Sequence, residues 1–424
     1  MASERPVIRE ISWRDIFPWL VIFRTFGLAI SMPVLLLATL GAVLTPVGWW
    51  VSEQCFVPSA TLEIDAPFAR VVQANRSGPH RPFPPLVPDD GRVPDSLSQI
   101  LSTQPDVIQP IFRRFVDPVA RFFRGQMTLQ QAGYFALGTF WMLVIWGFYG
   151  GAITRIAVVK LGREEQISLG EALGHVRRKL ISYMVSPLFP LLGVVLLAVP
   201  IFLLGMLMRV EYGVLAAGIL WVFALLGGLS IAILLLGTLF GWPLMWGVIS
   251  AEQHGDAFEA FSRSFSYTFG RPLHYLFYAV LATWFSGLSW LLVYHVSEWV
   301  ILATRLPAEI GVGPERWAML AVLIDQPAAT TNPERVGVWL IGSFESVVRT
   351  IATAFGYSFF WCQAAAIYLL LRQDVDQTEF DEVFVEREDR RYELPALQSV
   401  GSTSADESSE SSESSAESSE RSNS

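Results

Sequence analysis

Residues 214–239 read VLAAGILWVFALLGGLSIAILLLGTL, which is 26 consecutive residues without a charged side chain. As an α-helix this run is about 39 Å long at about 1.5 Å per residue, enough to cross a bilayer core about 30 Å thick. A helix of this length on the surface of a soluble protein has one apolar face and one polar face, whereas this run is apolar on all sides. The run therefore predicts a membrane-spanning helix.

Five further stretches are also long and apolar enough to cross a bilayer, so this helix indicates the class of the whole protein. The chain has 424 residues, of which 52% are hydrophobic and 16% charged, whereas soluble chains carry about 25% charged residues. We predict an all-α integral membrane protein with a six-span helical bundle in residues 26–371. Two cysteines exclude a disulfide-built fold. The six predicted spans are residues 26–50, 134–159, 183–208, 214–239, 275–302 and 347–371.

The net charge of −9 is a property of the C-terminal segment alone. Residues 372–424 contain fifteen acidic residues and five arginines, a net charge of −10, whereas residues 1–371 have a net charge of +1. From residue 399 onward Ser and Glu dominate, and such a segment buries too little apolar surface to fold. We predict a disordered acidic tail, which is either a solvated spacer or a binding segment for a protein partner.

Basic residues predict the orientation, because loops rich in Lys and Arg stay in the cytoplasm. One set of flanks holds fifteen bases and the opposite set eight, with the four arginines near the end of the long loop 51–133 counted in the second set. We therefore predict that both termini are cytoplasmic and that the protein resides in the inner or plasma membrane. The base-rich flanks are residues 1–25, 160–182, 250–274 and 372–391.

A pattern recurs at a spacing of 88 residues. Residues 168–173 (SLGEAL) and 256–261 (DAFEAF) each begin with a helix-capping residue followed three positions later by Glu, as in a capping box. Each is followed by bases, a proline and a predicted span, and a weaker copy begins at Ser12. The pattern predicts three units, each a cytoplasmic elbow helix plus two spans, whose bases contact anionic lipid. Coincidence is the competing interpretation, because only Glu and Ala are identical in both copies.

The segment from Asp256 to Pro272, an elbow helix followed by a proline and a span, resembles two bacterial inner-membrane families. These are the YciC-like proteins and the membrane domain attached to some glycerophosphodiester phosphodiesterases. The resemblance covers residues 160–371 and implies the same membrane architecture. It implies no hydrolase, because the phosphodiesterase catalytic domain is absent, and it transfers no functional residue.

The long loop 51–133 contains eleven prolines, concentrated between Pro79 and Pro94. Its last part differs, because apolar residues recur at helical spacing in residues 107–124 with arginines between them. We predict an amphipathic helix there, lying on the outer membrane surface or closing over the helix bundle as a lid. The apolar run of the fourth span continues past residue 239. We expect Pro243 to kink or end that helix, so that residues 243–249 enter the membrane–water interface.

Ionisable residues inside predicted spans are candidates for function. His295 and Glu298 lie one turn apart near the outer end of the fifth span, and Glu345 and Arg349 form an i, i+4 pair at the start of the sixth. They form either the polar wall of an outward-facing site, with Glu298 accepting from Arg349, or an interfacial ion network. Arg155, near the inner end of the second span, is interpreted as a topology anchor.

Sequence motifs favour a protein without catalytic activity. HExxH, GxSxG, P-loop and dinucleotide-binding motifs are absent from the sequence, and five histidines make a metal site improbable. No basic stripe indicates nucleic-acid binding, and no cofactor is expected. The leading hypothesis is an envelope scaffold, assembly factor or lipid-organising protein; the alternatives are a transporter or permease, and, third, a lipid enzyme. The sequence does not define the oligomeric state.

Overall fold

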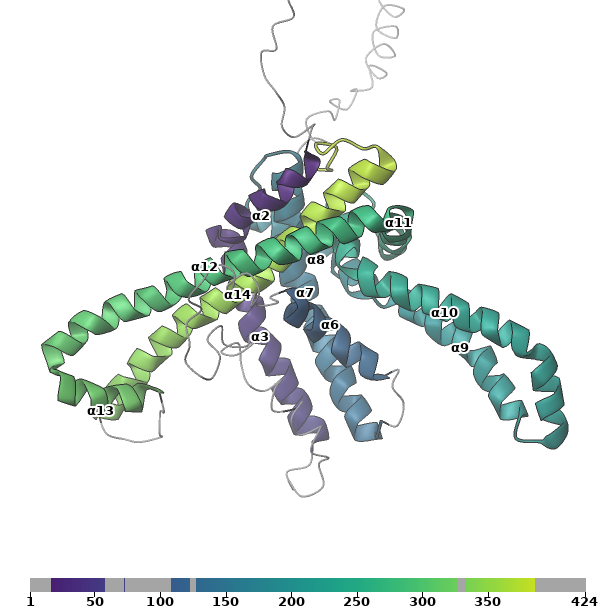
Figure 1. Ribbon diagram of the computed structural model, residues 1–424, viewed down its shortest axis with the longest axis horizontal. Coiled ribbons are helices and arrows are strands. Elements are labelled where there is room, and N and C mark those ends of the chain that lie inside the picture. Colours follow the sequence, from purple (N-terminus) through teal and green to yellow (C-terminus); the bar gives the residue numbers. More distant parts are fainter. Residues whose placement is uncertain (1–16, 58–71, 73–107, 123–126, 326–332, 386–424) are drawn as a thin grey trace, which may run out of the picture. The chain divides into compact units, whose positions relative to one another are not determined.

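The computed structural model describes residues 17–57, 72, 108–122, 127–325 and 333–385. Residues up to Val383 form one compact unit and those from Phe384 a second, and the description below concerns the first. The long helices are α3 (Met32–Phe56), α7 (Leu129–Gly162), α9 (Phe189–Leu207), α10 (Glu211–Ala251), α12 (Pro272–Val312) and α14 (Pro333–Asp376) (Figure 1). The short helices are α2 (Val21–Ala29), α6 (Ile108–Phe122), α8 (Leu169–Val185), α11 (Ala257–Gly270) and α13 (Pro314–Asp325).

Six helical segments are long and apolar enough to cross a membrane, with α8 and α9 counted together. The described part of the chain contains no strand, so the architecture is that of an all-α, multi-pass membrane protein. Helices α10, α12 and α14 contain 41, 41 and 44 residues. At about 1.5 Å per residue each is about 60 Å long, so these helices are longer than a perpendicular crossing of the bilayer core requires.

At three places in the described chain a short helix leads into a long apolar helix after a break of only one to three residues, and a proline lies at each of these junctions. Pro33 lies in the first turn of α3, Pro187 lies between α8 and α9, and Pro272 begins α12. Proline lacks the backbone N–H and is tolerated in the first turn of a helix, where that donor has no partner. The predicted spans 26–50 and 183–208 begin in the short helices, because apolar composition continues through both breaks.

The two predicted capping boxes differ in the structure. In α8 the Ser168 hydroxyl accepts from the Glu171 N–H (3.2 Å), and the Glu171 carboxylate accepts from the Ser168 N–H (2.9 Å), which confirms the box. In α11 Asp256 accepts from the Glu259 N–H (2.7 Å). The Glu259 carboxylate instead forms an ion pair with Arg263 one turn later (2.7 Å). The capping residue is therefore confirmed at both helices, and the reciprocal bond is confirmed only at α8.

Helix α10 does not end at Pro243, which corrects the expectation that this proline ends the helix. The helix continues to Ala251, and residues 241–251 are buried inside the protein. A proline removes one helical hydrogen bond and disturbs the carbonyls of the preceding turn. The Phe240 carbonyl in that turn accepts a hydrogen bond from the Tyr275 hydroxyl of α12 (2.8 Å). The burial of residues 241–251 within the protein therefore allows the helix to pass through the proline.

The core of the unit forms where α7, α10 and α14 contact one another. Gly150 of α7 lies against the indoles of Trp246 and Trp361, which stack at 4.1 Å between ring centroids and 15° between ring planes. Gly247 of α10 lies against the ring of Tyr368 in α14. Glycines allow such close approach of helices, because no Cβ separates the backbone from the neighbouring ring.

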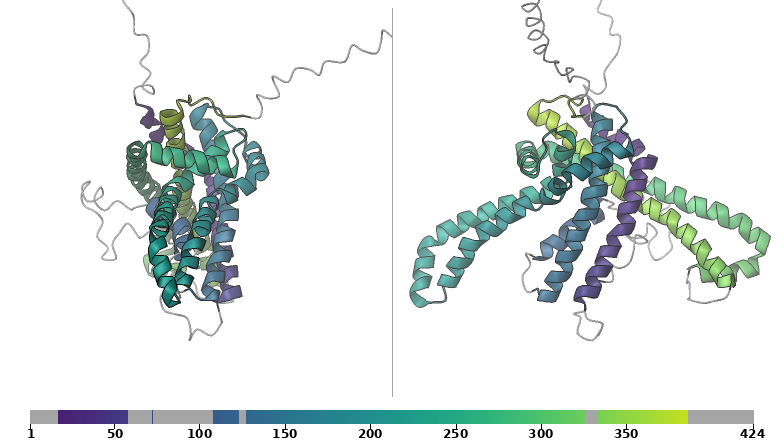
Figure 2. Two further views of the ribbon diagram at one scale, coloured as in Figure 1. Left: turned by 90° about the vertical axis from the view of Figure 1, so that its right-hand side faces the viewer. Right: turned by 180° about the vertical axis from the view of Figure 1, so that it is seen from behind.

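Helix α9 and the first part of α10 form an antiparallel hairpin (Figure 2), whose exposed side chains are mainly apolar. Leu196, Phe202, Ile219 and Phe223 are all more than 60% exposed. A continuous surface of this kind would aggregate in water, whereas lipid chains cover it without cost. The exposed face of the hairpin is therefore suited to contact with lipid chains.

The amphipathic segment predicted for residues 107–124 corresponds to α6, which packs on the bundle beside α7 (Figure 1). Its apolar stripe is buried, with Ile111 only 1% exposed and Phe115 7% exposed. Arg113 and Asp117 lie on its exposed face. Of the two predicted positions for this helix, the structure shows the one against the bundle. The Ser12 copy of the elbow pattern, the proline-rich segment 79–94 and the acidic segment 386–424 lie outside the described residues.

Candidate apolar binding site

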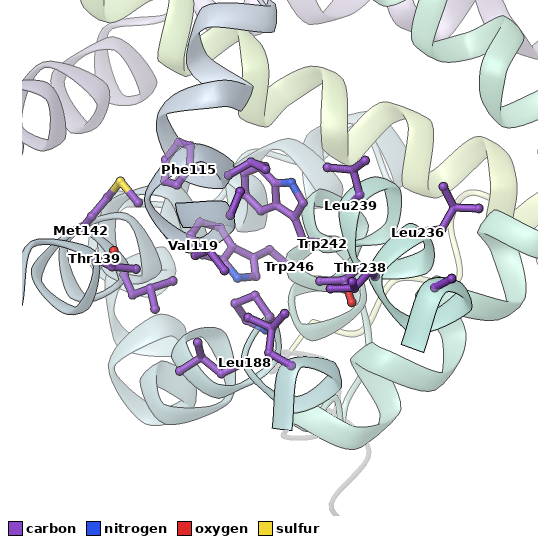
Figure 3. A pocket seen from close by; sticks show the side chains of 17 residues that line it. Phe115, Val119, Thr139, Met142, Leu188, Leu236, Thr238, Leu239, Trp242 and Trp246 are labelled. Carbon is purple, nitrogen blue, oxygen red and sulfur yellow. The ribbon is translucent and has the colours of Figure 1, made fainter. Parts of the chain in front are cut away.

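A cavity of about 430 Å³ lies between α6, α7, α9 and α10 (Figure 3). This volume is within the range of about 300–1,000 Å³ that is typical of ligand pockets. The Pro187–Leu188 junction before α9 forms one side of it. Representative lining residues are Phe115 and Val119 of α6, Thr139 and Met142 of α7, and Leu239 and Trp242 of α10.

The cavity is apolar and reaches the side of the molecule. Of its seventeen lining residues, thirteen carry no side-chain nitrogen or oxygen. Leu188 and Leu236 line it and are nevertheless 41% and 49% exposed. The cavity is therefore continuous with the apolar exterior of the α9–α10 hairpin, which lipid chains would cover.

Four lining side chains carry a nitrogen or oxygen, and they fall into two pairs. The Thr238 hydroxyl donates to the Leu234 carbonyl (2.7 Å), and the Trp246 indole N–H donates to the Tyr183 carbonyl (2.9 Å). The Thr139 hydroxyl and the Trp242 indole N–H are buried and have no hydrogen-bond partner among the described residues. These two groups are the only specific polar features that the described lining offers a ligand.

Aromatic contacts hold α6 against the cavity. Phe115 packs against Trp242 with 5.1 Å between ring centroids, and Trp242 in turn stacks on Phe360 of α14 at 5.7 Å. Polar groups of α6 are also engaged, because the Arg114 guanidinium donates to the Tyr357 hydroxyl (2.8 Å). Such contacts hold the helix that covers one wall of the cavity in a defined position.

The predicted polar cluster is found between α12 and α14 with one change of partner. Arg349 donates to Glu298 (2.9 Å from Nε to Oε1), as expected. Glu345, expected to pair with Arg349, instead accepts two hydrogen bonds from Arg305 (2.7 Å for the bond from Nε). His295 lies beside Tyr294, with 5.7 Å between ring centroids. Two ion pairs thus join α12 to α14.

The sequence contained a signal for the partner of Glu345 that the prediction missed. Arg305 follows Glu298 by seven residues, which places both on one face of α12, toward α14. An i, i+4 pair within one helix was the simpler interpretation of Glu345 and Arg349. In the structure the Arg349 guanidinium is engaged by Glu298 through Nε and Nη2, and Glu345 accepts the equivalent two-donor fork of Arg305.

We expect the two pairs to differ in strength, because burial reduces solvent screening. Glu345 and Arg305 have side chains 12% and 22% exposed, whereas those of Glu298 and Arg349 are 31% and 41% exposed. Glu345→Ala should lower the free energy of unfolding by about 3 kcal/mol and Glu298→Ala by about 1 kcal/mol or less. Unfolding by SDS titration measures both values. Equal losses would contradict this order.

A second polar cluster, which the sequence did not predict, lies at the C-terminal end of α10. The Glu252 carboxylate accepts hydrogen bonds from Arg263 (3.2 Å) and from the Tyr368 hydroxyl (3.2 Å). It also forms an ion pair with Arg372 of α14 (3.2 Å). Burial raises the pKa of the nearby Tyr267 hydroxyl in α11, and so does the hydrogen bond that it donates to Asp376.

The final carbonyl groups of α10 accept hydrogen bonds from basic side chains. Arg155 is 4% exposed and donates to the Ser250 carbonyl. Lys179 of α8 donates to the carbonyls of Glu252 (2.8 Å) and Gln253 (3.0 Å). Cations at a helix C-terminus are favoured by the helix dipole and by the unpaired carbonyls. Arg155 is thus buried within the protein, where a topology anchor that reaches toward headgroups would be exposed.

Among the described residues, no group of three or more His, Cys, Asp and Glu is placed to hold a metal ion. The helices and the cavity define the class of the protein, a multi-pass α-helical membrane protein with an apolar cavity that opens to its side. No family model, no curated protein and no solved structure matches the chain.

Proposed function

We propose that the protein is a non-enzymatic, lipid-organising component of the inner or plasma membrane and that it holds a lipid chain in the cavity. The observation that carries the proposal is the apolar cavity between α6, α7, α9 and α10. Its walls suit a hydrocarbon chain, because such a chain has no polar group that would lose a hydrogen bond in an apolar cavity.

The opening of the cavity favours a lipid over a water-soluble ligand. Leu188 and Leu236 lie at the exposed part of the lining, on the side that continues into the α9–α10 hairpin. A ligand that enters from this side comes from the bilayer, where lipid is the most abundant molecule. A single chain that leaves the bilayer for this cavity exchanges one apolar environment for another, so packing decides the affinity.

Basic side chains on the short helices support a second contact with lipid. Arg177 and Arg178 of α8 and Arg271 before α12 are exposed. In the proposed orientation, with both termini cytoplasmic, these bases meet the anionic headgroups of the inner leaflet. The three proline junctions fit three elbow units, each a short helix followed by two spans, and this repeat is part of the proposal. The resemblance of residues 160–371 to the YciC-like families is in keeping with the same architecture.

Filling the cavity should remove the bound lipid. Ala120→Trp on α6 and Ala232→Trp on α10 each place an indole at a lining position. We expect either variant to reduce the fraction of protein that carries lipid at least tenfold, because a bound chain and the new ring need the same space. Native mass spectrometry of protein purified in mild detergent measures this fraction.

The matched control is Ala303→Trp, which adds the same ring at an exposed position of α12 outside the cavity. This variant should keep the lipid-bound fraction of the wild type. If both cavity variants retain lipid, or if the wild type carries none, the proposed function is wrong.

A transporter is the competing function, and the three-unit arrangement favours it, because many transporters are built from repeats. The uninterrupted course of α10 through Pro243 argues against it, since transporter sites are typically formed at broken helices. Proteoliposomes that contain fluorescent phospholipid distinguish the two functions. A lipid-organising protein leaves the lipid exchange between leaflets unchanged, whereas a transporter of lipid accelerates it.

A further inference from the structure

The cavity contains two buried polar groups that the protein itself leaves without partners. Thr139 is 7% exposed and Trp242 is 6% exposed, and both line the cavity. The Thr139 hydroxyl and the Trp242 indole N–H have no hydrogen-bond partner among the described residues. Leaving a buried donor without an acceptor is unfavourable, so such groups normally indicate a missing partner.

Thr139 differs from Thr45, Thr154 and Thr238, although the Ser286 hydroxyl of α12, which does not line the cavity, is likewise buried without a partner among the described residues. A helical threonine ordinarily donates to the carbonyl four residues earlier. Thr45, Thr154 and Thr238 do so at 2.7–2.8 Å. The hydroxyl of Thr139 is free of this bond although it is buried, so its proton is available to a ligand in the cavity.

Trp242 differs in the same way from three other tryptophans of the bundle, while the N–H of Trp361, which lies outside the cavity lining, is also without a partner among the described residues. The indole N–H groups of Trp141, Trp146 and Trp246 donate to Leu44, Thr45 and Tyr183, at 2.9–3.0 Å. Trp242 has an N–H that can only donate, so the group that satisfies it must be an acceptor. α7 and α10 thus each contribute one unpartnered donor to a cavity that is otherwise apolar (Figure 3).

We infer that the cavity selects lipids whose apolar chain carries a carbonyl oxygen, above all the acyl esters of glycerolipids. This inference rests on the proposed function and adds the chemical class of the ligand. The ester carbonyl accepts a hydrogen bond from Trp242 or Thr139 and carries no charge, so the apolar walls tolerate it. An alkyl ether lipid has the same chains without this carbonyl and leaves both donors unsatisfied.

The experiment compares a diacyl phospholipid with the dialkyl ether lipid of identical headgroup and chain length. Equimolar mixtures compete for the full-length protein in detergent, and native mass spectrometry measures the ratio of the two complexes. A hydrogen bond of ordinary strength favours the ester by about threefold to tenfold. We expect the wild type to prefer the ester by a factor within this range if one donor binds the carbonyl, and by a larger factor if both donors do.

Variants assign the preference to the two donors. Thr139→Val keeps the shape of its side chain, and Trp242→Phe keeps an aromatic ring without the N–H; together they should reduce the ester-to-ether ratio to about one. The matched control combines Thr238→Val, whose hydroxyl already donates to its own helix, with Trp361→Phe, whose unpartnered N–H lies outside the cavity lining. This control should keep the wild-type ratio.

The outcomes separate the two proposals. Equal binding of ester and ether by the wild type overturns the carbonyl inference and leaves lipid binding intact. A failure of both lipids to bind overturns the proposed function itself. A third arm adds a prenylquinone, the other membrane molecule with an apolar chain and carbonyl oxygens. Displacement of the diacyl lipid by the quinone in the wild type, but not in the double variant, keeps the carbonyl inference and assigns the site to quinone.

Discussion

Replacing Glu252 by alanine should lower the free energy of unfolding by about 3–5 kcal/mol, the range found when one partner of a buried ion pair is removed. Its carboxylate contacts Arg263, Arg372 and Tyr368, each at 3.2 Å. The side chain of Arg372 is only 6% exposed, so its charge would remain buried without a carboxylate at its side. SDS titration of the detergent-solubilised protein measures the loss.

Two controls isolate the charge effect. Glu334 pairs with Arg316 at an exposed site, with side chains 50% and 70% exposed, so Glu334→Ala should change stability by less than about 1 kcal/mol. The double variant Glu252→Ala/Arg372→Met removes both charges and should recover most of the loss. A loss below about 1 kcal/mol for Glu252→Ala alone would show that this carboxylate does not stabilise the junction.

The second large effect is expected at Gly247, where α10 contacts α14. A Cβ at this position would lie 2.6 Å from Cγ of Tyr368 and 2.8 Å from its Cβ. These atoms lie next to the backbone of α14 and cannot rotate away, so the two helices must separate. Overpacking of a core costs about 1–3 kcal/mol and occasionally more. We expect Gly247→Leu to lower the free energy of unfolding by about 3 kcal/mol.

Gly228 provides the matched control in the same helix. A Cβ there meets no atom within 4 Å, and the residue is exposed. Gly228→Leu should therefore leave stability unchanged or raise it, since leucine is the better helix former. If both substitutions destabilise the protein equally, the effect comes from replacing a glycine in α10 and not from the contact of Gly247 with α14.

The helices were predictable because their signals are local. Hydrocarbon thickness sets the length of an apolar run, so each of the six predicted runs lies on long apolar helices. Capping residues act on backbone groups three positions away, which is why Ser168 and Asp256 marked the starts of α8 and α11 correctly. Pro243 was the exception, because the surroundings of α10, and not its own residues, decided that the helix continues.

The candidate site was less predictable, because its residues are ordinary in sequence. Thr139 is one of many threonines in apolar helices, and only the failure of its usual bond to the preceding turn distinguishes it. The expected cluster near Glu298 was identified from charges inside an apolar run. Its ion pair with Arg349 was predicted correctly, and the partner of Glu345 was not.

The sequence by itself determined the membrane class, the six apolar helices and the short helices α8 and α11 that precede two of them, because each depends on composition and spacing over a few turns. Only the tertiary structure decided that α6 closes one wall of a cavity and that Arg155 is buried at the end of α10. It also brought Thr139 and Trp242, 103 positions apart in the chain, into one lining. Contacts of this kind depend on how helices cross, and the periodicity of a single helix does not specify which neighbour its buried face meets.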